Sequence, residues 1–429
     1  MSNDFKETIS IRKGTALYVG AVLGSGILIL PGMTASIAGP SAIISWVIMI
    51  LLSIPLAFTF AFLSIEYPSA GGIATFSEKA FGKNIGAIIG WCFFIAGSIG
   101  QIIVSLTGGM YIVKVLDLPF YFAYVIAFLI LSIAICSNFF GLQMSGVFQV
   151  CIGVLTFLIL FITIVCSLPN IEMKNMNVNV SVNEIQPILH ASLLIFWSFF
   201  GWEAISSLAP EFKSPRRRNI IFSTGVAIVI IGFLYIGIAV SVIGTRSYSI
   251  DSNNSTALVI VIKNTLGDQF AWLVGLVAFM ICLGTTNAFI ASMSRLGYSL
   301  GKEGFAPKYL GYLDHKRNVP TYALMTVGFI AVTGIFISFI FHIGLDTLVL
   351  IPNSLGIVTY IVGTAAGIKL IKNRLGKFFS VTAFTCCVMV YPFIGDVIAI
   401  PIVVALMCLM YLYISNRKGS KCTLYKKKK

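Results

Sequence analysis

Apolar residues fill this chain in long continuous runs, and polar residues collect in the short stretches between them. A helix needs roughly 20 consecutive apolar residues to cross the hydrocarbon core of a bilayer, and about twelve runs approach this length. They lie near residues 14–37, 40–64, 84–113, 119–139, 145–168, 187–210, 219–244, 268–298, 320–342, 346–370, 378–393 and 396–414. The pattern predicts an all-α polytopic membrane protein with about twelve transmembrane helices.

Glycine interrupts two of the predicted helices near their middle. In the first run, the stretch "GAVLGSGILILPG" places Ser25 between two glycines. In the sixth run, "LLIFWSFFGWEAISSLAPEF" places Gly201 directly before Trp202 and Glu203. A glycine in a helix interior costs roughly 0.5–1 kcal/mol relative to alanine, so these positions predict broken helices. Small residues in membrane helices also serve close helix packing, which is the alternative interpretation.

Each interrupted run is the first of a set of five. The two sets cover about 14–168 and about 187–370, helices at about 378–414 follow, and a basic tail at 415–429 completes a single transmembrane domain of residues 1–429. An odd number of spans per set inverts the topology of the second set. Interrupted helices at corresponding positions of inverted halves are the best sequence indication of the central site of a transporter.

The two breaks offer opposite partial charges at the same depth. The half-helix that begins near Ser25–Ile27 presents free N–H groups, which favour an anion. The half-helix that ends near Phe196–Phe199 presents free carbonyl groups, which favour a cation. A ligand that carries both charges on one carbon is an amino acid, so the sequence predicts an amino acid site between the first and sixth spans.

Glu203 is the acidic residue that lies well inside a predicted span. A buried charge at bilayer depth is expensive and indicates a functional role. Two roles are open: Glu203 binds a coupling proton, or it braces the loosened backbone of the first span through hydrogen bonds.

Aromatic and polar residues on several spans are candidates for the pocket wall. Trp197, one helical turn before Gly201, is the candidate gate over a bound substrate. The other candidates are Gly24, Ser98, Gln101, Phe196, Ser198, Phe200, Gly201, Trp202, Thr285, Thr286, Asn287, Asn353 and Ser354. No cationic side chain and no second acidic side chain falls at this depth, so the pocket suits a neutral, apolar side chain.

Composition and charge agree with a membrane protein. The chain is 58% hydrophobic and 10% charged, with a net charge of +14, whereas soluble domains are about 25% charged. With both termini inside, all but four of the 29 basic residues lie on the cytoplasmic side; the exceptions are Lys114, Lys174, Arg246 and Lys263. This asymmetry predicts orientation in the cell membrane and contact with anionic lipid, and it does not indicate nucleic-acid binding.

Cysteine and histidine give no sign of a metal or cofactor. The nine cysteines lie mostly within spans without a CxxC pair, and the three histidines, His190, His315 and His342, are isolated. Neither a metal cluster nor a pairing of nucleophile and base is evident, so we expect no cofactor, no metal and no enzymatic activity.

Four motifs in order resemble the amino acid–polyamine–organocation superfamily. They are "GSGIL" in span one, "EYPSAGG" after span two, "FFGWE" with "APEFKSPRRR" in and after span six, and "SRLGYSLGKEGFAP" after span eight. "YPSAGG" with "LAPEFKSP" looks closest to the bacterial methionine and branched-chain amino acid exporters. The resemblance implies a LeuT-like five-plus-five inverted repeat, alternating access, and substrate contact at Ser25, Gly26, Ile27, Phe196, Trp197 and Ser198.

The resemblance also implies a substrate-capping role for Trp197 and proton sensing for Glu203, as in some members. Trp202 departs from the many relatives that carry a small aliphatic residue there; facing the cavity, it would reduce the pocket. We therefore expect a secondary-active transporter of a neutral, apolar amino acid, coupled to H+ or working by exchange. An uptake permease or exchanger of different specificity, such as for polyamines or cationic amino acids, and a non-transporting amino acid sensor are the alternatives.

Overall fold

The computed structural model describes residues 9–68, 72–140, 146–178, 181–203, 206, 209–248, 254–314, 316–317 and 319–426. Within these ranges every extended regular element is a helix, accompanied by two isolated β-bridges. The α-helices are α1 (Ile11–Val22), α2 (Gly26–Ala38), α3 (Ala42–Glu66), α4 (Gly72–Phe81), α5 (Lys83–Leu116), α6 (Phe122–Phe139), α7 (Gly146–Ser167), α8 (Val182–Ile195), α10 (Arg216–Gly244), α11 (Ala257–Leu266), α12 (Ala271–Lys302), α13 (Thr321–Ile340), α14 (Leu345–Leu370), α15 (Arg374–Val390) and α16 (Ala399–Lys426). Three parts of the chain named in the sequence analysis lie outside the described residues. They are residues 69–71 of "EYPSAGG", residues 204–205 of the sixth apolar run, and His315.

The hydrophobic pattern locates the long helices. Among the described residues, nine helical segments are long and apolar enough to cross a membrane. Two of them, Gly26–Glu66 and Arg374–Ser415, each cover more than one predicted run, because short 3-10 turns join their helices. Large apolar side chains such as Leu51, Val229 and Phe329 are exposed on the outside of the bundle. A multi-pass, all-helical membrane protein is therefore confirmed.

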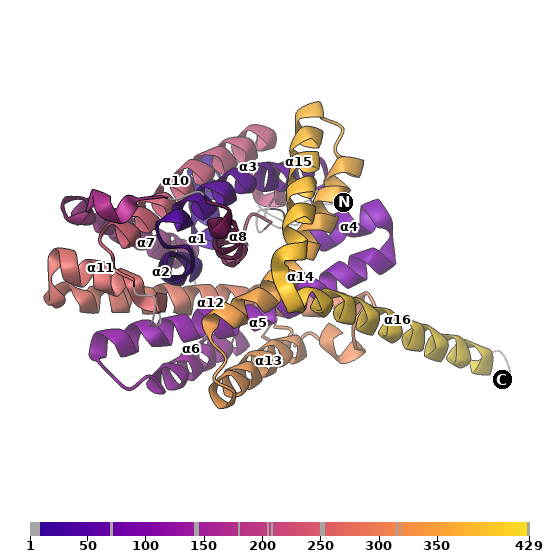
Figure 1. Cartoon of the computed structure of the whole chain (residues 1–429). Helices are drawn as coiled ribbons and strands as arrows, with labels where there is room; N and C mark the ends of the chain where they lie inside the picture. Colours follow the sequence, from indigo (N-terminus) through magenta and orange to yellow (C-terminus); the bar gives the residue numbers. More distant parts are fainter. Residues whose placement is uncertain are drawn as a thin grey trace.

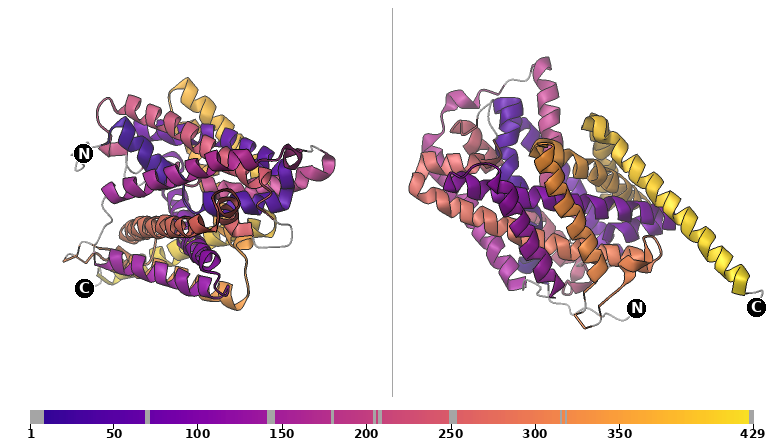
Figure 2. Two further views of the ribbon diagram at one scale, coloured as in Figure 1. Left: turned by 90° about the vertical axis from the view of Figure 1, so that its left-hand side faces the viewer. Right: turned by 90° about the horizontal axis from the view of Figure 1, so that it is seen from below.

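The long helices form two groups that face each other. Helices α1, α2, α3, α8 and α10 pack on one another as a first group, and α5, α6, α12 and α13 pack as a second group. In Figure 1 the first group lies above the second. Helix α14 contacts α3 and α8 of the first group and α5 of the second. Helix α16 packs against α5 and α14, and its C-terminal part extends beyond the bundle (Figures 1 and 2).

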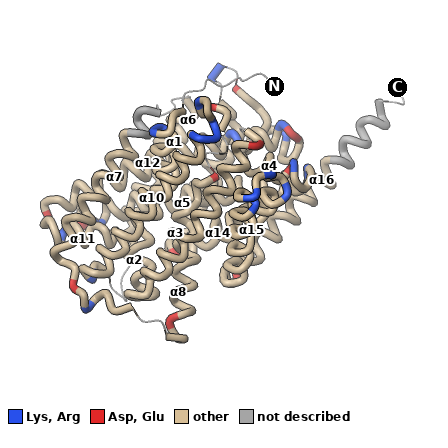
Figure 3. The backbone as a smooth tube through the Cα atoms, turned by 90° about the horizontal axis from the view of Figure 1, so that it is seen from above, with Lys and Arg blue, Asp and Glu red and all other residues tan. Residues whose placement is uncertain are grey.

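Charged residues separate to the two ends of the helices. Most Lys and Arg residues gather around α4, α15 and the N-terminal end of the chain (Figure 3). The short helix α4, which the hydrophobic pattern did not predict, is joined to α14 at this end, because Lys369 Nζ donates a 2.6 Å hydrogen bond to the Ala80 carbonyl. The carboxylate of Glu66 accepts from the Lys372 N–H at 3.1 Å and holds α3 at the same end.

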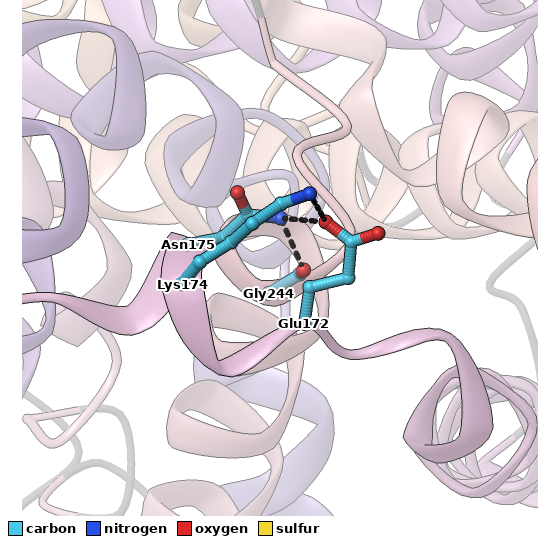
Figure 4. Close-up of polar contacts among 4 residues, drawn as sticks. All are labelled: Glu172, Lys174, Asn175 and Gly244. Carbon is cyan, nitrogen blue, oxygen red and sulfur yellow. Dashed lines mark hydrogen bonds and ion pairs between the residues drawn. The ribbon is translucent and has the colours of Figure 1, made fainter.

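The loop between α7 and α8 is fixed to the opposite end of the bundle. Asn175 Nδ2 donates to the Gly244 carbonyl at 2.9 Å, and Lys174 Nζ lies 2.9 Å from Glu172 Oε2 (Figure 4). The hydrogen bond and positive charge of Lys174 hold the pKa of the exposed Glu172 carboxyl below its ordinary value. The next loop contains the short helix α11. The described parts of both loops therefore have defined structure next to the membrane-spanning helices.

Candidate functional site

The first predicted break is present between α1 and α2. Helix α1 ends at Val22, and the Leu23 and Gly24 N–H groups fold back to the Val19 and Val22 carbonyls at 2.8 Å. Helix α2 then begins at Gly26. The first amides of a helix have no acceptor within it, so those of Gly26 and Ile27 point out of the N-terminal end of α2. This end is the place where the sequence predicts an anion.

The second break follows α8. A 3-10 turn at Phe196–Phe199 is followed by Phe200 in an extended conformation and by Gly201 at a φ of +124°, which only glycine adopts without strain. A side chain at Gly201 would also lie 2.9 Å from the Ala21 carbonyl oxygen. The backbone of the sixth span is therefore turned sharply at Gly201 and packed directly on the end of α1.

Gly26 makes the second close contact between the two breaks. A Cβ atom at this position would lie 2.9 Å from Ser198 Cα and 3.0 Å from Ser198 Cβ. The indole N–H of Trp197 donates to Ser25 Oγ at 3.4 Å, which adds a polar contact across the same junction. The two interrupted helices therefore meet at bilayer depth with no room for larger side chains.

Two buried tyrosines form hydrogen bonds with backbone carbonyl groups at the breaks. The Tyr235 hydroxyl, from α10, lies 2.9 Å from both the Val22 and the Ser198 carbonyl oxygens. The Tyr360 hydroxyl, from α14, donates to the Phe199 carbonyl at 3.3 Å. Each hydroxyl has one proton: that of Tyr235 is available to the Ser198 carbonyl, because Val22 already accepts from the Gly24 N–H, and that of Tyr360 is shared with Glu203. The prediction that the carbonyls at Phe196–Phe199 are free is therefore wrong for Ser198, which a tyrosine from a distant helix satisfies.

Tyr235→Phe tests this junction directly. We expect the free energy of unfolding to fall by about 1–3 kcal/mol, because the variant leaves the buried Ser198 carbonyl without a donor, whereas the Val22 carbonyl keeps the Gly24 N–H. The change is measured by the intrinsic fluorescence of the purified protein during heating in detergent. Tyr121→Phe is the matched control, since its side chain is 53% exposed; equal melting of the two variants would contradict the role of Tyr235.

Two cavities adjoin the breaks. The central cavity, of about 50 Å³, lies between the two helix groups. The vestibule, of about 760 Å³, extends from Gly201 to Glu78, Arg295 and Glu303 near the end of the molecule that carries the N-terminus. The residues that line both are Ala21, Phe93, Glu203, Thr285 and Phe289. The two cavities therefore share part of their walls, and the vestibule lies between the junction of the broken helices and the basic end of the bundle.

Most of the predicted site residues line these cavities. The central cavity is lined by Gly24, Ser25, Gly26, Gln101, Trp197, Ser198, Phe200, Glu203 and Thr285. Gly201 and Asn287 line the vestibule. The ring of Trp197 lies over Gly100 of α5, where an added Cβ would come 2.7 Å from Trp197 Cη2.

Other candidates for the pocket lining form the walls behind it. Trp202 is fully buried, and its ring lies 5.5 Å from that of Tyr18. Phe196 packs against Phe200 and Tyr360. Neither side chain lines the two cavities of this structure, and the predicted contact of Phe196 with substrate stays a prediction. The turn at Gly201 directs Trp202 toward α1.

Polar candidates also bond away from the cavities. The Ser98 hydroxyl donates to the Phe94 carbonyl of its own helix at 2.7 Å, and Asn353 Nδ2 donates to the Leu193 carbonyl of α8 at 2.7 Å. Thr286 and Ser354 are likewise buried without lining either cavity, and so is the Ile27 side chain. Ser98 and Asn353 therefore line neither cavity of this structure, and Asn353 joins α14 to α8.

Glu203 stabilises the break of its own span. Its Oε2 accepts a 3.0 Å hydrogen bond from the Gly201 N–H and another from the Tyr360 hydroxyl. The side chain is 6% exposed and lines both cavities. These two hydrogen bonds join Glu203 to its own turn and to α14, and the hypothesis that it also braces the first span stays a hypothesis. Within the described residues no group of three or more His, Cys, Asp or Glu could hold a metal ion.

Sequence reasoning missed Tyr235 and Tyr360. A tyrosine in the middle of an apolar span carries a hydroxyl that needs a partner, and this signal was available for both residues. The partners of these hydroxyls could not be predicted, because each hydroxyl bonds to backbone more than 35 positions away in sequence.

Comparisons with known proteins agree on one family. The model of the family described as "Amino acid permease" matches residues 9–421. The chain is 33% identical to the "Uncharacterized amino acid permease YecA" of Bacillus subtilis, over 98% of each chain. It is 26% identical to the "L-methionine/branched-chain amino acid exporter YjeH" of Escherichia coli, over 91% of this chain and 92% of the relative. It is 24% identical to the "Branched-chain amino acid permease BcaP" of Lactococcus lactis, over 87% and 83%.

Proposed function

The chain belongs to the amino acid permease family, and we propose that it is a secondary-active transporter that moves a neutral, apolar amino acid across the cell membrane by alternating access. The side chain of the substrate is of the branched-chain or methionine-like kind. The observation that carries this proposal is the direct contact of two interrupted helices at a cavity that shares part of its wall with the vestibule. The printed names of two relatives, an exporter of L-methionine and branched-chain amino acids and a branched-chain amino acid permease, support this substrate class.

We propose that about twelve membrane helices form a LeuT-like five-plus-five inverted repeat. The first repeat covers about 14–168, the second about 187–370, and the last two helices about 378–414. The breaks at Leu23–Ser25 and after Ile195 support this arrangement, because each begins a set of five predicted spans. Both termini lie in the cytoplasm, and the gathering of basic residues at one end supports this orientation.

The binding mode follows from the lining of the central cavity. The α-carboxylate of the substrate accepts from the first amides of α2 at Gly26 and Ile27. The apolar side chain of the substrate lies against Trp197 and Phe200. Among the described residues that line this cavity there is no Lys, Arg or His, and the one carboxylate, Glu203, already accepts two hydrogen bonds. This chemistry favours a neutral substrate over a polyamine or a cationic amino acid.

The vestibule and the proposed orientation together correspond to a conformation open to the cytoplasm. The central cavity, at about 50 Å³, is small beside the vestibule of about 760 Å³, and we propose that the aromatic wall at Trp197 and Phe200 moves to admit the substrate. Glu203 touches the water-accessible vestibule and the central cavity at once. We propose that it exchanges the coupling proton; exchange of one amino acid for another is the alternative mode.

Counterflow in proteoliposomes tests the function. Vesicles that contain the purified full-length chain and are loaded with unlabelled leucine should accumulate external labelled leucine, and unlabelled methionine, isoleucine or valine should compete. Lysine and putrescine should not compete, because nothing in the central cavity balances a second positive charge. Absence of counterflow with every one of the twenty amino acids would rule out a transport function, and competition by lysine alone would move the substrate to the cationic class.

A further inference from the structure

The broken helices do not by themselves identify which groups accept hydrogen bonds from the ammonium group of the substrate. The Val22 carbonyl accepts from the Gly24 N–H, which leaves the single proton of the Tyr235 hydroxyl for the Ser198 carbonyl. The Tyr360 hydroxyl lies against both the Phe199 carbonyl and Glu203, so the Phe199 carbonyl shares one proton with that carboxylate. Some carbonyls at the junction therefore already serve donors of the protein itself, and an ammonium group, with three N–H donors, needs further acceptors. A buried ammonium group needs acceptors of its own, since an unpaired charge at this depth is costly.

Gln101 of α5 offers such an acceptor. Its side chain is 1% exposed and lines the central cavity from the second helix group. Its Nε2 donates to the Gly97 carbonyl at 2.8 Å, and its Oε1 has no hydrogen-bond partner in the described part of the chain. The bond to Gly97 fixes the orientation of the amide, because the opposite orientation would place Oε1 against a carbonyl oxygen. The atom left over at the cavity is therefore an acceptor.

A second polar atom without a partner belongs to Ser198, which lines the same cavity. The Ser198 hydroxyl is 2% exposed and has no hydrogen-bond partner among the described residues. It lies against Gly26, the first residue of α2, where the carboxylate of the substrate is placed. A hydroxyl donor beside the amides of α2 and an amide oxygen on α5 together match the two charged groups of an α-amino acid.

We propose that Gln101 recognises the α-ammonium group of the substrate through its Oε1 atom. This inference rests on the proposed function. It names the residue that lets the site distinguish an amino acid from a carboxylic acid of the same shape that lacks the ammonium group. Glu203 is the competing acceptor in the same cavity, but its Oε2 already accepts from Gly201 and Tyr360. Because the acceptor is uncharged, the site can also release the substrate without breaking a buried ion pair.

The experiment compares ligands that differ at the ammonium group alone. Inhibition of labelled leucine binding is measured with leucine and with 4-methyl-2-oxopentanoate, which keeps the carboxylate and side chain but lacks the ammonium group. The wild-type chain should bind leucine more tightly. In Gln101→Met, which has nearly the same shape but no acceptor oxygen, we expect the leucine affinity to fall about tenfold to 100-fold, while the affinity for the oxo acid stays unchanged.

Three further variants separate the possible results. Ser98→Ala, on the same helix but bonded to its own backbone, should retain the preference for leucine. Gln101→Asn keeps the acceptor on a shorter arm and should show an intermediate preference, which provides a second reading if Gln101→Met folds poorly. The proposal is overturned if the Gln101 variants keep the full preference, if they weaken both ligands equally, or if Glu203→Gln alone abolishes the preference. A wild-type chain that binds no amino acid would instead refute the proposed function.

Discussion

Gly26→Ala is expected to reduce leucine counterflow about 100-fold. A displacement of the substrate-binding groups by about 1 Å is enough for a loss of this size. The new Cβ would lie 2.9 Å from Ser198 Cα, a backbone atom that cannot rotate away. The Ser198 carbonyl is held in turn by the Tyr235 hydroxyl, so the strain must separate the two breaks. The amides of α2 would then lose their position relative to Trp197 and Ser198.

Gly20→Ala is the matched control for this prediction. Gly20 lies on α1, six residues before Gly26, and an added Cβ meets no atom within 4 Å. Transport by this variant should stay within about twofold of the wild type, as is usual for exposed positions. Flux and membrane insertion are measured on the same proteoliposomes, so that loss of transport is separated from loss of protein. Normal flux in Gly26→Ala would show that the contact with Ser198 opens during transport and that the glycine serves packing alone.

The positions of both breaks could be predicted because their signal is local. Glycine around Ser25 and at Gly201 interrupts apolar runs that are otherwise continuous, and the structure ends α1 at Val22 and α8 at Ile195. The extent of the other helices follows from the same runs. Local composition, however, says nothing about which distant side chains satisfy the carbonyl groups that a break releases.

The lining of the cavity depends on contacts that periodicity does not contain. Ser98 and Gln101 lie one turn apart on α5, yet the short serine hydroxyl bonds to its own helix while the longer glutamine reaches the cavity. Trp202 follows Gly201 in sequence, but the positive φ of Gly201 turns the chain and places the indole against Tyr18. A helical projection of the sixth span cannot predict this, because the span is not helical there.

Glu203→Gln is expected to abolish leucine accumulation driven by a proton gradient while leucine exchange continues. The amide keeps an oxygen that can accept from the Gly201 N–H and the Tyr360 hydroxyl, so the break of the sixth span stays in place. What it loses is the ability to bind and release a proton between the vestibule and the central cavity, both of which Glu203 touches. A loss of coupling without a loss of exchange is the signature of a proton-binding residue.

Two comparisons make this prediction specific. Tyr360→Phe removes a hydroxyl donor from the carboxylate but leaves its charge, so accumulation should remain dependent on the proton gradient. Glu203→Leu removes both the charge and the acceptor, and it should lower the thermal stability as well as the flux, because the buried Gly201 N–H is left without a partner. Flux is measured over a range of pH with the gradient collapsed and restored by an ionophore. If Glu203→Gln accumulates leucine as the wild type does, the carboxylate is a brace for the sixth span, and the coupling resides elsewhere or the protein works by exchange.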